Sequence, residues 1–515
     1  MKTNVLQYGE SGAFANCPDA AAVEFRDQSV SFGQLQQLSL RVAAAICRRS
    51  PAKNTPVCVY LPRSIETIAA NLGILASRNC YSNLDVRSPA NRTQVILTNL
   101  APCLIITSKN SASQLNSLQI TDSQLLFIED CVELDLSPAD LSEIHRRRSA
   151  ALDVDPACII NTSGSTGVPK SVVMNHRNII DFIDWTLEEF HFSHTDRFAC
   201  LSPLHFDIYT LELYTSLASG ATLCLIPDTL AAFPAKLVEF LHHQRISFLF
   251  WVPSVMVAIA NLGLLEKFPL QALNRVFFAG EVFPTRQYNI WKQNLPNTEF
   301  VNLYGPIEIT VDCTFFRINR QLSDDEPIPI GFPCKNTEIL ILNEHNLPVS
   351  VGELGELCVK GSSLAMGYWN DPQRTAQSFT QNPLHNHYPE IIYRTGDVAS
   401  INQRGEILFH GRRDYQIKHS GYRIELGEIE NAATATGLTQ QACAIYDSTR
   451  SEIVLYYSNP TPVDPNTLRT NLLAAIPKYM LPNSFHFLPE LPRNPNGKID
   501  RLQLQQLTRN HDKSP

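Results

Sequence analysis

The stretch from Asn161 to Lys170, which reads Asn-Thr-Ser-Gly-Ser-Thr-Gly-Val-Pro-Lys, concentrates groups that can bind a phosphate. Glycines let a backbone approach a ligand closely, and free backbone N–H groups in such a loop bind anions. The hydroxyl groups can donate hydrogen bonds to phosphate oxygens, and Lys170 adds a positive charge. The residues that we expect to contact phosphate are Thr162, Ser163, Gly164, Ser165, Thr166, Gly167 and Lys170.

The position of this loop favours a binding role over the alternative, a flexible surface turn. Clusters of Ser, Thr and Gly are usually turns, but this one directly follows the apolar run Ala157–Ile160, which predicts a buried strand. A Walker loop is excluded, because Gly164 and Gly167 lie closer together than that pattern requires. The sequence therefore predicts a phosphate-binding loop of another kind.

The elements that must position this loop alternate between short apolar runs and helical patterns. The runs Val57–Leu61 and Cys103–Ile106 lie on either side of the helical pattern Ile65–Leu75. Such alternation is typical of α/β proteins with parallel sheets. From about Pro329 to His410, short strands between turns predict a β-rich subdomain. A length of 515 residues predicts two or more domains.

Composition narrows the function class and the compartment. Hydrophobic residues make up 44% of the chain and charged residues 18%, which is typical of a soluble globular protein. A net charge of -8, with no Lys/Arg-rich run that stands out, argues against a nucleic-acid partner. The 13 cysteines include no Cys-x-x-Cys pair, and the N-terminus has no apolar signal core. We therefore expect a cytoplasmic protein with reduced thiols.

One uncharged stretch, Ser247 to Leu265, is about as long as a membrane span. A proline, an asparagine and a glycine interrupt it. We therefore predict a buried strand over Phe248–Val252, a helix from about Ser254, and no membrane association.

Five more motifs follow the loop along the chain: Tyr304-Gly-Pro-Ile-Glu308, Tyr393-Arg-Thr-Gly-Asp397, Gly411-Arg-Arg-Asp414, Gly421-Tyr-Arg-Ile-Glu-Leu-Gly-Glu-Ile-Glu430 and Asn494-Pro-Asn-Gly-Lys-Ile-Asp500. In this order, the motifs resemble those of the adenylate-forming (ANL) superfamily. Acyl-CoA synthetases, luciferases and the amino-acid adenylation domains of nonribosomal peptide synthesis belong to this superfamily. The resemblance implies an enzyme that joins a carboxylate to the α-phosphate of ATP and releases pyrophosphate.

The resemblance also implies nucleotide-binding roles. Glu308 matches the glutamate that binds Mg²⁺, and an oxygen ligand suits that ion. Asp397 matches the residue that accepts hydrogen bonds from the ribose hydroxyls, and Arg412 matches a second nucleotide contact. Tyr304 resembles the aromatic residue that stacks on adenine. The other nucleotide contacts that the resemblance implies are Gly280, Glu281 and Asn302.

Lys498 matches the catalytic lysine of the superfamily, which bridges the substrate carboxylate and the α-phosphate. The resemblance places it in a small, mobile α+β domain of residues 414–515, after a large domain of layered sheets and helices over residues 1–413. Asp414 would be the hinge between them. In family members the small domain rotates after the first half-reaction. The loop at Gly421 would then face the tunnel through which a pantetheine thiol attacks the adenylate.

Asp207 matches the acid that pairs with the α-ammonium group of an amino-acid substrate. Its alternative role is the N-cap of a helix that begins at Ile208. Carried over by position, the substrate pocket consists of Asp207, Ile208, Leu211, Phe250, Phe277, Ala279, Leu303, Val311, Asp312 and Lys498. The apolar walls and two phenylalanines imply a small neutral amino acid, with L-proline slightly ahead of alanine. Asp312 either approaches the substrate nitrogen or points away from it.

No carrier-protein serine motif follows Lys498, so we expect a free-standing enzyme that passes its amino acid to the phosphopantetheine thiol of a separate carrier protein. Two enzymatic alternatives remain, an acyl-CoA synthetase that releases a CoA thioester and a D-alanine–carrier protein ligase. A third alternative is a non-catalytic nucleotide-binding relative. Retention of Glu308, Asp397 and Lys498 argues against it.

Overall fold

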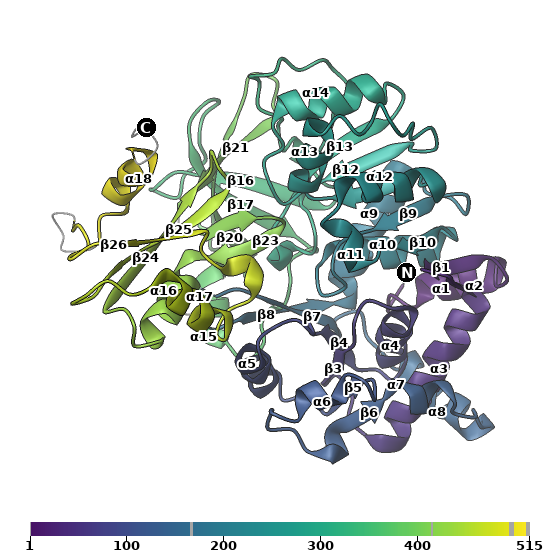
Figure 1. Cartoon of the computed structure of the whole chain (residues 1–515). Coiled ribbons are helices and arrows are strands. Elements are labelled where there is room, and N and C mark those ends of the chain that lie inside the picture. Colours follow the sequence, from purple (N-terminus) through teal and green to yellow (C-terminus); the bar gives the residue numbers. More distant parts are fainter. Residues whose placement is uncertain (1, 165–167, 414–415, 494–498, 511–515) are drawn as a thin grey trace.

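The computed structural model describes residues 2–164, 168–413, 416–493 and 499–510 of the chain (Figure 1). Five residues with expected roles lie outside these ranges: Ser165, Thr166, Gly167, Asp414 and Lys498. The roles of these five residues, and the domain boundary at the expected hinge, stay predictions.

The first large sheet has nine strands in the order β15-β14-β13-β12-β11-β9-β10-β1-β2. The run from β13 to β1 is parallel, and β2, β14 and β15 pair antiparallel at the two ends. The strands are β1 (Ala21–Phe25), β2 (Gln28–Ser31), β9 (Arg197–Cys200), β10 (Thr222–Leu225), β11 (Phe248–Trp251), β12 (Arg275–Phe278), β13 (Glu299–Tyr304), β14 (Thr314–Arg317) and β15 (Phe332–Pro333).

The second large sheet has seven strands in the order β18-β8-β7-β4-β3-β5-β6. It is parallel from β7 to β6, whereas β8 and β18 run antiparallel to their neighbours. The strands are β3 (Pro56–Tyr60), β4 (Cys80–Asn83), β5 (Leu104–Thr107), β6 (Leu125–Phe127), β7 (Pro156–Thr162), β8 (Lys170–Asn175) and β18 (Gly367–Tyr368). The α/β fold class that the alternating sequence pattern predicts is confirmed.

One hydrophobic core joins the two large sheets through the helices α3 (Phe32–Arg49), α4 (Ile65–Ala76), α9 (His176–Phe190) and α10 (Ile208–Ser219). Helices α4 and α10 are buried on nearly every side, as expected of interior helices. The other helices are α1 (Gln7–Ser11), α2 (Ala13–Asn16), α5 (Ala90–Leu100), α6 (Ala112–Leu115), α7 (Ile128–Val132), α8 (Pro138–Ser149), α11 (Asp228–Ala231), α12 (Pro234–His243), α13 (Pro253–Asn261), α14 (Thr285–Asn294), α15 (Pro372–Ser378), α16 (Leu426–Ala435), α17 (Pro465–Leu473) and α18 (Arg501–Asn510), with the short 3-10 helices η1 (Asp122–Gln124), η2 (Ile307–Ile309) and η3 (Lys478–Met480).

The β-rich subdomain is a five-stranded antiparallel sheet. Its strands are β16 (Thr337–Leu342), β17 (Gly355–Gly361), β19 (Phe379–Gln381), β20 (Ile391–Ile401) and β21 (Ile407–Arg412). The C-terminal elements lie to the left in Figure 1 and pack around hydrophobic clusters of their own. Their strands are β22 (Gln416–His419) and β23 (Tyr422–Glu425), which form a hairpin, and β24 (Gln441–Asp447), β25 (Glu452–Ser458) and β26 (Ser484–Phe487), which form a separate sheet.

The uncharged stretch from Ser247 folds as strand β11 and helix α13, as the sequence predicts. Among the described residues, no helix combines the length and the apolar character that crossing a membrane requires. All 13 cysteines are free thiols.

Candidate active site

The turn between β13 and β14 carries side chains that the sequence assigns to three different tasks. Strand β13 ends at Tyr304, η2 contains Glu308, and Asp312 lies just before β14. Between them, Thr310 and Val311 adopt φ values of 60° and 68°. Positive φ is costly for β-branched residues, so the surrounding contacts must hold this turn in place.

Three contacts hold the turn. Thr310 Oγ1 donates a hydrogen bond of 2.8 Å to Ser363 O, and Asp312 N donates one of 3.1 Å to Thr310 O. Gly305 lets the chain close on itself, because a Cβ atom there would lie 2.5 Å from Asp312 Cα and 2.6 Å from Val311 O. The turn therefore fixes the positions of its two acidic side chains.

Glu308 is fully buried and contacts three side chains. Arg423 Nη1 lies 2.7 Å from Oε2, and Tyr368 OH donates a hydrogen bond of 2.8 Å to Oε1. Lys170 Nζ lies 3.8 Å from Oε1. Burial alone would raise the pKa of Glu308, but Arg423 and Lys170 outweigh it and lower the pKa to about 2. Glu308 is therefore an ionised carboxylate at neutral pH.

Two residues of the predicted phosphate-binding loop contact the hairpin β22–β23. Ser163 Oγ donates a hydrogen bond of 2.5 Å to Arg423 O, and Lys170 Nζ lies 3.4 Å from Glu425 Oε1. Burial, followed by Arg423, lowers the pKa of Lys170 to about 8 against the opposing effects of Glu308 and Glu425. The loop, the turn after β13 and the hairpin thus form one ionic cluster.

A second cluster gathers the residues that we expect to bind the nucleoside. Tyr304 OH donates a hydrogen bond to Asp397 Oδ2, and Arg412 Nη1 donates one of 2.5 Å to Oδ1. The ring centroids of Tyr304 and Phe409 are 6.0 Å apart. The structure therefore places three expected nucleotide-binding residues side by side, and their contact with a nucleotide stays a prediction.

The remaining expected nucleotide contacts follow β12 and lie in β13. Gly280 has a φ of 90°, and Glu281 Oε1 accepts a hydrogen bond of 2.7 Å from Gly421 N of the hairpin. Asn302 donates a hydrogen bond of 2.8 Å to Pro329 O. Glu281 thus contacts the C-terminal hairpin, whereas Asn302 supports the chain that leads into the β-rich sheet.

The expected pocket residues come together in the core. One buried hydrophobic cluster contains Ile208, Leu211, Phe250, Phe277, Ala279, Leu303 and Val311. The ring of Phe277 makes edge-to-face contacts with four aromatic rings, whose centroids lie 4.5 to 6.3 Å away: those of Phe190, Phe192, Phe248 and Phe250. Asp312, which is 3% exposed, adds a carboxyl group to these apolar surroundings.

Asp207 is the N-cap of α10. Capping is the role that the sequence offered as an alternative to substrate binding. Asp207 Oδ1 accepts a hydrogen bond of 3.0 Å from Ile208 N. Burial raises its pKa to about 6, and Lys418 acts in the opposite direction. Because capping uses one carboxylate oxygen, the other oxygen is available to accept a hydrogen bond from an ammonium group. The two roles are compatible.

Three residues of this centre received no role from the sequence: Tyr368, Lys418 and Arg423. The last two belong to the hairpin, which adjoins and overlaps the motif Gly421–Glu430, so this motif was the signal that could have found them. Burial lowers the pKa of Lys418, against the raising effect of Asp397 and of the two pocket carboxylates. Tyr368 comes from the two-residue strand β18, and no pattern around it marks it.

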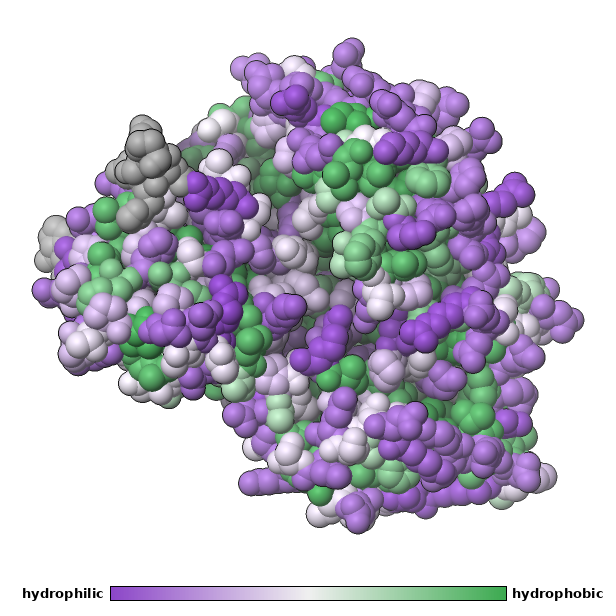
Figure 2. Space-filling model, viewed as in Figure 1, coloured by the Kyte–Doolittle hydropathy of each residue, from purple (hydrophilic) through white to green (hydrophobic). Residues whose placement is uncertain are grey.

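Further contacts join the C-terminal part to the large layers. Arg92 of α5 forms a buried ion pair with Glu428 of α16. Tyr422 packs against Phe206 with ring centroids 5.3 Å apart, and it stacks on Tyr479 at 3.6 Å. Figure 2 shows a hollow between the C-terminal elements on the left and the large layers on the right. The hairpin therefore closes one side of the site.

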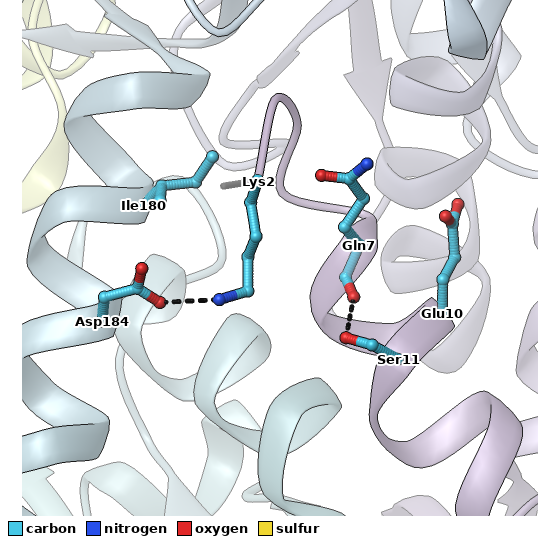
Figure 3. Close-up of a pocket in the computed structure, with 6 residues that line it drawn as sticks. All are labelled: Lys2, Gln7, Glu10, Ser11, Ile180 and Asp184. Carbon is cyan, nitrogen blue, oxygen red and sulfur yellow. Dashed lines mark hydrogen bonds and ion pairs between the residues drawn. The ribbon is translucent and has the colours of Figure 1, made fainter.

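A separate cavity near the N-terminus has none of these residues in its lining (Figure 3). There, Lys2 points toward Asp184 of α9, and Nζ lies 2.9 Å from Oδ1. Ser11 Oγ donates a hydrogen bond of 2.6 Å to Gln7 O within α1. The ion pair of Lys2 with Asp184 attaches the N-terminal segment to α9.

A family model described as AMP-binding enzyme matches residues 12–369. The chain belongs to this family of AMP-binding enzymes. The enzyme is 32% identical over 499 residues to "Zwittermicin A synthase ZmaJ" of Bacillus cereus, an alignment that covers 95% of this chain and 92% of that protein. It is 32% identical over 490 residues to "Tyrocidine synthase 3" of Brevibacillus parabrevis, where the alignment covers 95% of this chain but 7% of that protein.

Solved adenylation domains have the same fold as this AMP-binding enzyme. The Vibrio cholerae adenylation domain AlmE, in complex with glycyl-adenosine-5'-phosphate, superposes with a TM-score of 0.81 at 23% identity and covers 98% of this chain and 97% of its own. NpsA-ThdA of Klebsiella oxytoca, an artificially fused adenylation–PCP di-domain, has a TM-score of 0.80 at 23% identity and covers 94% and 93%. The sequence-based assignment to the adenylate-forming superfamily is confirmed.

We expect Gly305→Ala to displace the turn that carries Glu308 and Asp312. The new Cβ would meet two backbone atoms at 2.5 and 2.6 Å, and backbone cannot rotate away as a side chain can. ATP affinity, measured by calorimetry, should fall by about tenfold or more, since loss of one hydrogen bond to a charged group costs roughly 1.5–3 kcal/mol. Gly33→Ala is the control, because its nearest neighbour lies 3.2 Å away. Unchanged ATP affinity in Gly305→Ala would show that the nucleotide does not depend on this turn.

Proposed function

We propose that this enzyme activates a small amino acid with ATP and then transfers it to the phosphopantetheine thiol of a separate carrier protein. The observation that carries the proposal is an ionic cluster around Glu308 together with a buried apolar cluster of the expected pocket residues, next to which Asp207 caps α10. The cluster suits a polyphosphate, and the pocket suits an amino acid with a small side chain. Similarity to chains from peptide synthesis supports the same class of reaction.

In the first half-reaction, the substrate carboxylate attacks the α-phosphate of ATP and pyrophosphate leaves. Positive charge at the reacting phosphate lowers the barrier, because negative charge accumulates there in the transition state. Ser163 and Lys170 would bind phosphate oxygens, and Asp397 would hold the ribose. Asp207 would pair with the α-ammonium group of the substrate, and Lys498 would bridge the two reacting groups.

Mg²⁺ fits the acidic member of the ionic cluster. Glu308 is a buried, ionised carboxylate, and its Oε2 already lies 2.7 Å from a cationic group of Arg423. Oxygen ligands suit Mg²⁺, so the donor chemistry agrees with a metal at this residue. When bound, Mg²⁺ would neutralise charge on the phosphates, and Glu308 would hold it after separating from Arg423.

The position of the hairpin supports a second half-reaction in a different domain orientation. Arg423 and Glu425 contact the same side chains, Glu308 and Lys170, that the first half-reaction needs for metal and phosphate. The hairpin would therefore compete with the metal and the nucleotide phosphates for the side chains of Glu308 and Lys170. At Gly421, a side chain would meet Val252 at 3.0 Å, so glycine keeps this approach open for a thiol.

The substrate class follows from the pocket walls. Phe250 and Phe277 are fully buried and leave little room, and most of the other wall residues are apolar. L-proline and alanine are the substrates that the sequence favours.

ATP–pyrophosphate exchange over a panel of amino acids, including D-alanine, tests the proposal. We expect strong exchange with a small amino acid and little with Phe, Trp, Arg or Glu, because charged side chains would lose hydration without a partner. Exchange with fatty or aryl acids alone would favour an acyl-CoA synthetase instead.

Amino-acid binding should weaken at acidic pH. The pKa of Asp207 is raised to about 6, so the carboxylate that pairs with the substrate ammonium is present above that pH and becomes protonated below it. The KM for the amino acid should rise by up to about tenfold per pH unit below pH 6, while the KM for ATP changes less. Asp207→Asn should remove this pH dependence and raise the amino-acid KM at neutral pH, since losing one partner of a buried ion pair costs roughly 2–5 kcal/mol. A wild-type-like KM in Asp207→Asn would leave Asp207 as a helix cap alone.

Two substitutions should separate the half-reactions. Lys498→Ala should slow adenylate formation by about 10²–10³-fold yet spare thioester formation from supplied adenylate, because its cation serves the first step. Arg423→Met should do the reverse, because this side chain pairs with Glu308 only while the hairpin occupies the site. Single-turnover transfer to a holo carrier protein and pyrophosphate exchange measure the two steps. Arg423→Lys is the control, which keeps the charge. Equal losses in both steps for each variant would contradict the two-orientation proposal.

A further inference from the structure

Asp312 is an unusual member of the substrate pocket. It is 3% exposed, and its Oδ2 accepts no hydrogen bond from any described residue. Burial, followed by repulsion from Asp207, raises its pKa well above the usual range. A buried carboxyl group without a partner destabilises a protein, so such a group needs an explanation.

The backbone just before Asp312 is strained. The two preceding residues, Thr310 and Val311, are β-branched and have positive φ. Backbone strain of this kind persists where the surrounding structure enforces it, and it concentrates at ligand sites. Here the close approach of Gly305 and the hydrogen bond from Thr310 to Ser363 enforce it. The turn thus directs an acid into an apolar pocket.

The charged groups that face Asp312 do not neutralise it. Asp207 repels it, and Lys418 is the cation that acts on it. Burial lowers the pKa of Lys418, and Lys418 forms no ion pair with any described residue. It also belongs to the hairpin, so under the proposed domain rotation it would leave the pocket when the amino acid first binds. Because Lys498 is assigned to the substrate carboxylate and the α-phosphate, the partner of Asp312 would then come from the substrate.

We propose that Asp312 accepts a hydrogen bond from the side chain of the substrate, which therefore carries a donor, a hydroxyl or an ammonium group, on its β-carbon. This inference rests on the proposed amino-acid activation and narrows its substrate class. Asp207 would hold the α-ammonium group, and the two acids lie close enough to interact electrostatically. Phe250 and Phe277 are fully buried members of the expected pocket, so we place the donor close to the α-carbon. Proline and alanine offer no such donor.

Three amino acids of nearly equal size test the inference in the full-length enzyme. L-serine, L-2,3-diaminopropionate and L-2-aminobutyrate differ only in the group on the β-carbon, which is a hydroxyl, an ammonium or a methyl. We expect kcat/KM for ATP–pyrophosphate exchange with serine or with 2,3-diaminopropionate to exceed that with 2-aminobutyrate by roughly 10²–10⁴-fold. A site built around a hydrogen bond rejects an analogue that lacks the donor.

Substitutions at Asp312 identify the donor. Asp312→Val should erase the preference and raise exchange with 2-aminobutyrate above the wild-type level, a gain that a misfolded variant cannot show. Asp312→Asn should keep serine but lose 2,3-diaminopropionate, because an amide accepts a hydrogen bond from a hydroxyl but does not balance a second ammonium charge. Thr314→Val is the matched control, since Thr314 is a buried neighbour whose hydroxyl also has no partner among the described residues. It should leave the preference unchanged.

The possible outcomes separate this inference from the proposed function. If the wild-type enzyme uses alanine, proline or 2-aminobutyrate as well as the donor-bearing substrates, or if Asp312→Val leaves the preference intact, the inference is wrong and amino-acid activation stands. If no amino acid supports exchange, the proposed function is wrong and the inference falls with it. The wild-type comparison alone decides the matter should Asp312→Val fail to fold.

Discussion

A buried cluster of opposite charges joins three distant parts of the chain. Glu308 follows β13, Lys170 begins β8, and Arg423 belongs to the C-terminal hairpin. Burying such charges is costly, and the cost is offset only when each charge has close partners. Removing any one of them leaves the others buried and unbalanced. These ion pairs therefore help to fix the second large sheet, the turn and the hairpin relative to one another.

The turn after β13 explains how so short a segment contributes to several subsites. Tyr304 reaches the nucleoside cluster, Glu308 the ionic cluster and Asp312 the apolar pocket. A regular strand would point alternate side chains to opposite faces of the sheet. Here the strand ends at Tyr304 and η2 carries Glu308, so the alternation already stops before that residue. Two consecutive residues with positive φ then redirect the chain before Asp312, at a cost of roughly 1–3 kcal/mol each.

Much of this architecture could be predicted from the sequence, because strong local signals coincide with it. Apolar runs between helical patterns predicted the parallel sheets, and the motif order placed Tyr304, Asp397 and Arg412 together. Contacts between distant segments could not be predicted this way. Tyr368 comes from a two-residue strand without a pattern, and the pairing of Arg423 with Glu308 depends on how the C-terminal part docks. The N-cap and substrate roles of Asp207 looked exclusive from sequence, yet its two oxygens make them compatible.

The aromatic packing around Phe277 links substrate range to folding stability. Its ring is a wall of the proposed substrate pocket and is also the centre of edge-to-face contacts with four other rings. Trimming such a residue to alanine typically costs about 3–5 kcal/mol, a large share of the roughly 5–15 kcal/mol by which domains are stable. A lineage that acquires a bulkier substrate by enlarging this wall would first need stabilising changes elsewhere. Under the proposed pocket assignment, substrate choice would therefore change less readily at Phe277 than at walls outside the aromatic group.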